Sequence, residues 1–177
     1  GVLYSCAVPG SGNILGGLAA VIRHDAPTTT DALIARAGLK CAFGYNPMSA
    51  GGWKGTRPST RMGAAALLRG RLDEVRLKMD KRRRAAGKAR QDLAFTAAEA
   101  ILADVLAGRQ RLRCHVHKSD DIAALLRIVD EFKLKVTVEH ASDVHDVAVF
   151  AELKRRRIPV VYGPVESFPY KVELRHE

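Results

Sequence analysis

The sequence is poor in aromatic residues and has no long apolar run. Phe, Trp and Tyr make up 6% of its 177 residues, although its formal net charge is +10. Because no aromatic residues are interleaved with the basic segments, we expect these segments to be solvated and do not expect nucleic-acid binding. No apolar stretch reaches the roughly 18 residues that a membrane span needs, and the first residues do not resemble a secretory leader. We therefore expect no membrane partner and a cytoplasmic location.

Two further classes of site are disfavoured by what is missing. The three cysteines, Cys6, Cys41 and Cys114, form no CxxC pair, and each lies in an apolar, strand-like segment. We expect buried, reduced thiols rather than disulfides or a thiolate zinc site. No GxGxxG or Walker sequence follows any predicted strand, which argues against a nucleotide-binding α/β module.

The second half of the chain alternates between strand-like and helical segments. Strands are predicted at residues 112–117, 135–141 and 158–163, and helices at 120–133 and 144–156. Short loops join these segments, so the pattern predicts a parallel sheet with right-handed crossover connections. The expected fold class is therefore α/β.

The first half is more irregular. Strands are predicted at residues 2–8, 14–23 and 39–44, and helices at 30–37, 59–79 and 96–106. Thr96 and Glu99 fit a capping box at the start of the last of these helices. Residues 78–92, which are rich in Lys and Arg, are interpreted as a basic linker inside a single domain of residues 1–177.

Histidine is concentrated at the C-terminal ends of two neighbouring strands. His115 and His117 close one predicted strand, and His140 closes the next. Side chains at the carboxyl ends of parallel strands converge on one site, and two imidazoles from adjacent strands suit a divalent transition metal. We therefore predict that His115 and His140 are metal ligands. His117 shares a face with His115 by the period-2 geometry of a strand, and either ligation or a structural role suits it.

Other polar residues have weaker claims. Glu139 alternates with His140, so we expect its side chain to face the helix layer. Asp120 and Asp121 are interpreted as residues of a helix start, where negative charge is favourable. The other three histidines are expected in a loop, in a first helical turn and in the tail: His24, His145 and His176.

Several segments, in this order and spacing, resemble a known family. They are PGSGNILGG, LKCAFGYNP, LRCHVHKSDDIAALLRIVDEF, the Glu-His pair at 139–140 and IPVVYGP. Together they resemble the central part of the amidohydrolase superfamily, and most of all its imidazolonepropionase-like metal-dependent hydrolases. The resemblance implies part of a TIM-type (β/α)₈ barrel, roughly its strands 2 to 7, with one or two divalent metals, usually zinc. It makes His115 the strand-5 ligand and His140 the strand-6 ligand.

The chain also departs from the family's pattern. Related proteins often carry Glu where Tyr45 stands, and a tyrosine cannot bridge two metals as a carboxylate does, which disfavours a binuclear centre. The sequence contains neither an upstream HxH pair nor a later strand with the family's catalytic aspartate. We therefore expect an incomplete barrel that is inactive by itself.

The resemblance implies a hydrolase of C–N bonds other than peptide bonds. Its substrate would be a small amide or cyclic amide, attacked by metal-activated water, and His117 would be a catalytic residue that contacts the substrate or its oxyanion. The alternative is a non-catalytic partial barrel, a binding or structural subunit whose basic linker contacts a partner. Open strand edges would favour an oligomer in either case.

Overall fold

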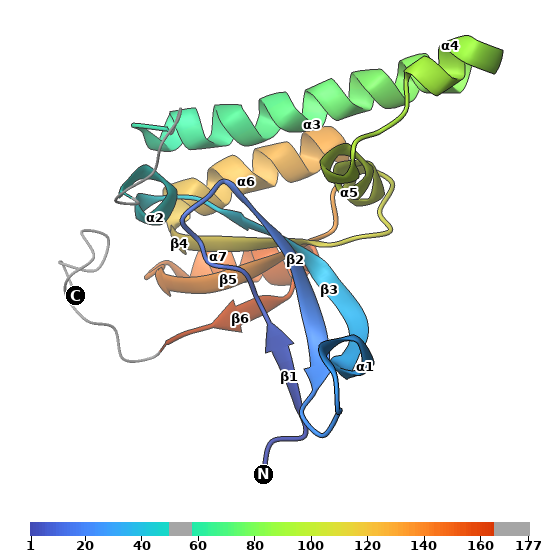
Figure 1. The fold of residues 1–177 in the computed structure, drawn as a ribbon. Helices are drawn as coiled ribbons and strands as arrows, with labels where there is room; N and C mark the ends of the chain where they lie inside the picture. Colours follow the sequence, from blue (N-terminus) through green and yellow to red (C-terminus); the bar gives the residue numbers. More distant parts are fainter. Residues whose placement is uncertain (50–57, 165–177) are drawn as a thin grey trace.

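A curled sheet of six strands organises the chain (Figure 1). The computed structural model describes residues 1–49 and 58–164, and its strands neighbour one another in sequence order. The strands are β1 (Tyr4–Ala7), β2 (Leu15–Arg23), β3 (Leu33–Ala42), β4 (Leu112–Lys118), β5 (Val136–Asp143) and β6 (Val160–Tyr162). The helices are α1 (Thr29–Ala32), α2 (Tyr45–Ser49), α3 (Arg61–Arg84), α4 (Gly87–Asp92), α5 (Ala97–Leu106), α6 (Ser119–Phe132) and α7 (Val147–Arg155).

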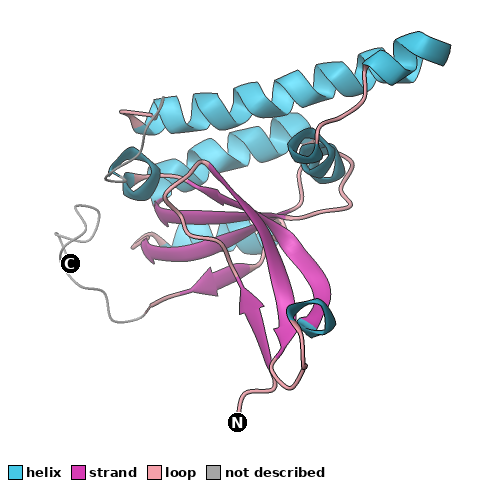
Figure 2. Cartoon of the chain, in the orientation of Figure 1, coloured by secondary structure: helices cyan, strands magenta, loops and turns pink. Residues whose placement is uncertain are grey.

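The sheet is antiparallel in its first half and parallel in its second. β3, β4, β5 and β6 run parallel, as the alternation of strands and helices predicts. β1 pairs antiparallel with β2, and β2 with β3. This part of the sheet extends away from α3, α5 and α6 and has only the short α1 at its far end (Figures 1 and 2). The α/β class is confirmed as a half-barrel sheet. A TIM-type barrel has parallel strands, whereas β1 with β2 and β2 with β3 are antiparallel, so the assignment to barrel strands 2 to 7 stays a prediction.

Strand β3 begins earlier than the sequence pattern predicts. The helix expected at 30–37 is present only as the short α1, which Thr28 caps through its side chain. From Leu33 onward the backbone pairs with β2. Gly38, which directly follows the predicted helix, lies inside β3, so strand pairing overrides the local helical preference.

The basic segment 78–92 is helical, and its interpretation as a linker is wrong. α3 continues to Arg84, and α4 follows after two residues. Lys and Arg are good helix formers, and their charge suits the negative end of the helix dipole. Arg82 also lies over the Phe95 ring, 5.3 Å from its centroid, which fixes this end of α3 to the chain before α5. Neither α3 nor any other helix in residues 1–49 and 58–164 has the length and apolarity to cross a membrane.

The later helices follow the sequence prediction closely. α5 begins with the predicted capping box, in which the Glu99 N–H donates to Thr96 Oγ1 and the Thr96 N–H donates to Glu99 Oε2. α6 spans Ser119–Phe132. α7 begins at Val147, three residues later than predicted, because Asp146 accepts a hydrogen bond from the Ala148 N–H and caps it there.

The hydrophobic core lies between the sheet and its covering helices. Along β4, Leu112, Cys114 and Val116 are completely buried. Leu68 and Leu72 of α3 belong to the same core cluster and are also fully buried. Alternate side chains of β4 therefore lie in the core, and the side chains between them lie on the other face of the sheet.

The cysteines divide into a buried pair and an exposed residue. Cys41 Sγ and Cys114 Sγ lie 3.3 Å apart in the core, which confirms the expected buried thiols at these two positions. Burial raises the pKa of the Cys114 thiol well above its ordinary value. Cys6 is exposed on β1, so the prediction of burial is wrong there, because β1 lies at the edge of the sheet.

Gly38 allows β3 to pass close to the chain that leads into β4. Its φ is +111°, and a Cβ at this position would lie 2.6 Å from the Arg111 carbonyl oxygen. The same oxygen accepts a hydrogen bond from the Leu39 N–H at 2.9 Å. A side chain at position 38 would therefore disrupt the junction between the antiparallel and parallel halves of the sheet.

We expect Gly38→Ala to lower the free energy of unfolding by about 2 kcal/mol or more, because it adds backbone strain and a steric clash. Gly70→Ala is the matched control, since nothing lies within 4 Å of its added Cβ on α3. That variant should be slightly more stable than the parent chain, by about 0.5–1 kcal/mol. Urea unfolding followed by circular dichroism measures both, and equal effects would contradict the role of Gly38.

Candidate functional site

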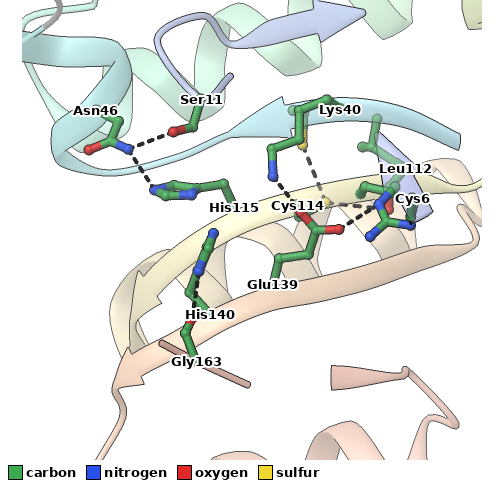
Figure 3. A network of polar contacts seen from close by, with 12 residues as sticks. Cys6, Ser11, Lys40, Asn46, Leu112, Cys114, His115, Glu139, His140 and Gly163 are labelled. Carbon is green, nitrogen blue, oxygen red and sulfur yellow. Dashed lines mark hydrogen bonds and ion pairs between the residues drawn. The ribbon is translucent and has the colours of Figure 1, made fainter. Parts of the chain in front are cut away.

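Three histidine rings meet on the sheet face opposite the helices. The ring centroids of His115 and His140 lie 4.4 Å apart, those of His115 and His117 4.7 Å, and those of His117 and His140 5.1 Å. His115 and His117 are each only 3% exposed. The structure thus brings together all three histidines that the sequence analysis singled out, and Figure 3 shows His115 and His140 directed toward each other.

Each ring is oriented by a hydrogen-bond partner outside the cluster. His140 Nδ1 lies 2.6 Å from the Gly163 carbonyl oxygen, which can only accept, so this ring donates from Nδ1 and carries its lone pair on Nε2. His117 Nδ1 lies 2.6 Å from the Ser142 hydroxyl. These contacts fix the rings before any ligand binds.

Asn46, in the first turn of α2, orients the third ring. Its amide nitrogen lies 3.0 Å from His115 Nε2 and 2.6 Å from Ser11 Oγ. Figure 3 shows this side chain bridging the loop after β1 and the histidine. Nothing in the sequence pattern identified Asn46, because it follows the strand and belongs to a helix of five residues.

The backbone of β5 turns His140 into the cluster. His140 has a φ of +79° and Ala141 a φ of +51°, both in the left-handed region that residues other than glycine seldom adopt. Regular alternation would put Glu139 and His140 on opposite faces of the sheet. Because the backbone departs from the extended form here, both side chains line the same cavity. The prediction that Glu139 faces the helix layer is therefore wrong.

Glu139 is the centre of a buried ion cluster beside the histidines. Its Oε2 pairs with Lys40 Nζ from β3, and its Oε1 accepts a hydrogen bond from Arg113 Nε of β4 at 2.5 Å. Lys40 is 4% exposed and Glu139 5% exposed. We call Lys40, Arg113 and Glu139 the ion triad. It ties three adjacent strands together on the face that carries the histidines.

The ion triad and two of the histidines line one cavity of about 500 Å³. The other walls come from the loop at residues 8–11, from Asn46 and from residues 161–163 at the end of β6. A cavity of this volume accommodates a small organic molecule. The sequence analysis missed Lys40 and Arg113, although a signal existed. Each is a cation between two apolar residues of its strand, at a position that alternates with core residues.

The histidine cluster has the donor chemistry of a metal centre. His115 and His140, on neighbouring strands, would offer imidazole nitrogens to a divalent metal, and a carbonyl that holds Nδ1 is the usual outer partner of a zinc-binding histidine. Within the described residues, however, no group of three or more His, Cys, Asp or Glu side chains is arranged to hold a metal ion. Any complete ligand set therefore needs an adjustment of these rings or further ligands.

The remaining candidates lie apart from this cluster. Asp120 and Asp121 occupy the first turn of α6, as expected, and Asp121 is buried in an ion pair with Arg61. His24 contacts Ser5 Oγ at 2.7 Å on the exposed β1–β2 edge. His145 is 71% exposed beside Asp143. His176 lies outside the described residues.

Comparison with solved structures reveals a likeness to an enzyme. The chain aligns with the crystal structure of an amidohydrolase from Thermotoga maritima MSB8, with 34% sequence identity and a TM-score of 0.85. The alignment covers 99% of this chain and 45% of that one, so the chain spans less than half the length of its neighbour. Searches of family models and of curated proteins found no match. The chain therefore has an amidohydrolase-like fold.

We expect Glu139→Gln to lower the free energy of unfolding by about 3 kcal/mol, because it leaves the buried Lys40 and the partly buried Arg113 without their shared carboxylate. Glu131→Gln is the matched control, since Glu131 pairs with Arg69 on the exposed surface of α6. The control should leave unfolding nearly unchanged. Chemical unfolding compares the two variants. An equally small effect of both would mean that the ion triad does not stabilise the sheet.

Proposed function

We propose that this chain forms part of a metal-dependent amidohydrolase that cleaves amide or cyclic C–N bonds in small molecules. The observation that carries the proposal is the meeting of His115, His117 and His140 beside a cavity, in a chain with an amidohydrolase-like fold. The substrate, the metal and the activity of the whole protein belong to the proposal. A shared fold does not by itself establish a reaction, so the proposed reaction is assigned from the side chains of the site.

His115 and His140 are the proposed metal ligands, and zinc is the metal that best suits imidazole donors of this kind. When bound, a divalent metal polarises the substrate carbonyl and lowers the pKa of a water molecule. The chain's own residues prepare the ligands for this task. Gly163 accepts a hydrogen bond from His140 Nδ1 and so leaves the Nε2 lone pair for a metal. Asn46 lies against His115 Nε2, so His115 would bind a metal through Nδ1, with the Asn46 amide turned so that its oxygen accepts from Nε2–H.

His117 is proposed to act on the substrate. If the Ser142 hydroxyl donates to His117 Nδ1, the neutral ring carries its proton on Nε2. From there it can donate a hydrogen bond to the carbonyl oxygen as negative charge develops on it. The burial of His117 strengthens such a bond, because little water competes for either partner.

The non-catalytic alternative, a partial barrel serving as a binding subunit, is the weaker candidate. The basic segment that this alternative takes as a linker forms the C-terminal end of α3 and α4. The likeness to an amidohydrolase also favours an enzymatic origin. An oligomer through the open sheet edges stays a prediction under either function.

We expect His115→Ala and His140→Ala each to weaken zinc binding by more than about tenfold, because each removes an imidazole donor. Isothermal titration calorimetry with zinc measures the affinity, and elemental analysis of the purified protein measures the stoichiometry. His145→Ala is the control, since this exposed histidine lies outside the cavity. Retention of one zinc per chain in the double variant His115→Ala/His140→Ala would refute the assignment.

A further inference from the structure

The ion triad has more positive than negative charge. Lys40 and Arg113 share the single carboxylate of Glu139, which leaves one excess positive charge in a buried cluster. Among the described residues that line this cavity, these three are the ones that carry formal charge at neutral pH. An uncompensated charge in a poorly hydrated site is costly, so a monovalent anion beside the cluster is favourable.

The two cations also have hydrogen-bond donors to spare. An ammonium group has three N–H donors, and Lys40 spends one of them on Glu139 within the described part of the chain. A guanidinium group has five, of which Arg113 directs one to Glu139 and one to Cys6 Sγ at 3.5 Å. Both side chains line the cavity, so their other donors are close to a ligand inside it.

We propose that Lys40 and Arg113 form a binding site for the carboxylate group of a small molecule. The planar fork of Arg113 matches a carboxylate, and the single excess charge matches a monoanion better than a phosphate dianion. Glu139 holds the two cations in place and keeps the site selective for one negative charge.

The location of this site suggests which part of a ligand it takes. His115 and His140 line the same cavity, so a molecule whose carboxylate binds Lys40 and Arg113 places its neighbouring atoms beside the histidine cluster. If the proposed function holds, the substrate is an amide that carries a carboxylate close to the bond that is cleaved. This statement about the substrate depends on the proposed function, whereas the carboxylate site itself does not.

The test compares two probes of nearly equal shape on the 177-residue chain without added metal. N-acetylglycine carries a carboxylate, and N-acetylglycinamide replaces it with a neutral amide. Titrations followed by the NMR signals of the histidine rings should show saturable binding of N-acetylglycine and none of N-acetylglycinamide. Inorganic phosphate should bind more weakly than N-acetylglycine. Arg113→Met should weaken the binding by about tenfold or more, as expected for loss of a charged hydrogen bond.

Two further variants make the result decisive. Arg109→Met removes the same charge from an exposed arginine that pairs with Asp104, and it should leave binding unchanged. Lys40→Met/Glu139→Gln removes one charge of each sign, so its folding is less at risk, and it should also weaken N-acetylglycine binding. Equal binding of the two probes, tighter binding of phosphate, or equal losses in Arg113→Met and Arg109→Met would overturn the proposal. Because no metal is present, these outcomes are independent of the zinc experiment.

Discussion

The left-handed backbone at the end of β5 is the constraint on which the site depends. Two consecutive residues other than glycine, His140 and Ala141, adopt positive φ values, each of which costs about 1–3 kcal/mol unless the surroundings compensate. The compensation is visible on both sides of the turn. Glu139 is held by cations from two neighbouring strands, and the His140 ring is held by the Gly163 carbonyl. Strain of this kind is characteristic of functional sites, and here it sets two adjacent side chains on one cavity wall.

The ion triad and the histidine cluster therefore form one arrangement rather than two. A buried carboxylate shared by two cations contributes specificity of position more than net stability, since desolvation offsets much of the attraction. Glu139 directly precedes His140 in β5. The ion pair of Glu139 therefore fixes the backbone next to the residue at which φ becomes positive. The cavity that results has a cationic part and an imidazole part side by side.

The sequence predicts the parallel half of the fold well, because that half follows from local periodicity. It also predicts that the three histidines meet, although His140 reaches the cluster through a left-handed backbone that periodicity does not indicate. It fails where distant pairing decides the outcome. The segment that begins at Leu33 becomes a strand because it pairs with β2. The basic C-terminal end of α3 is helical, and Arg82 there contacts the Phe95 ring. The orientation of Glu139 was missed because period-2 reasoning assumes an extended backbone, and no sequence signal announces a left-handed histidine.

The strict alternation along β4 has a consequence for how this segment can evolve. Leu112, Cys114 and Val116 serve the core, whereas Arg113 and His115 serve the cavity. A shift of β4 by one residue relative to the sheet would turn every side chain to the opposite face. The imidazole and guanidinium groups would then face the helices, and the core side chains would face the cavity. Tolerated insertions and deletions should therefore be confined to the connecting loops. Any homologue that keeps the histidines in the cavity must also keep the register of β4 in the sheet.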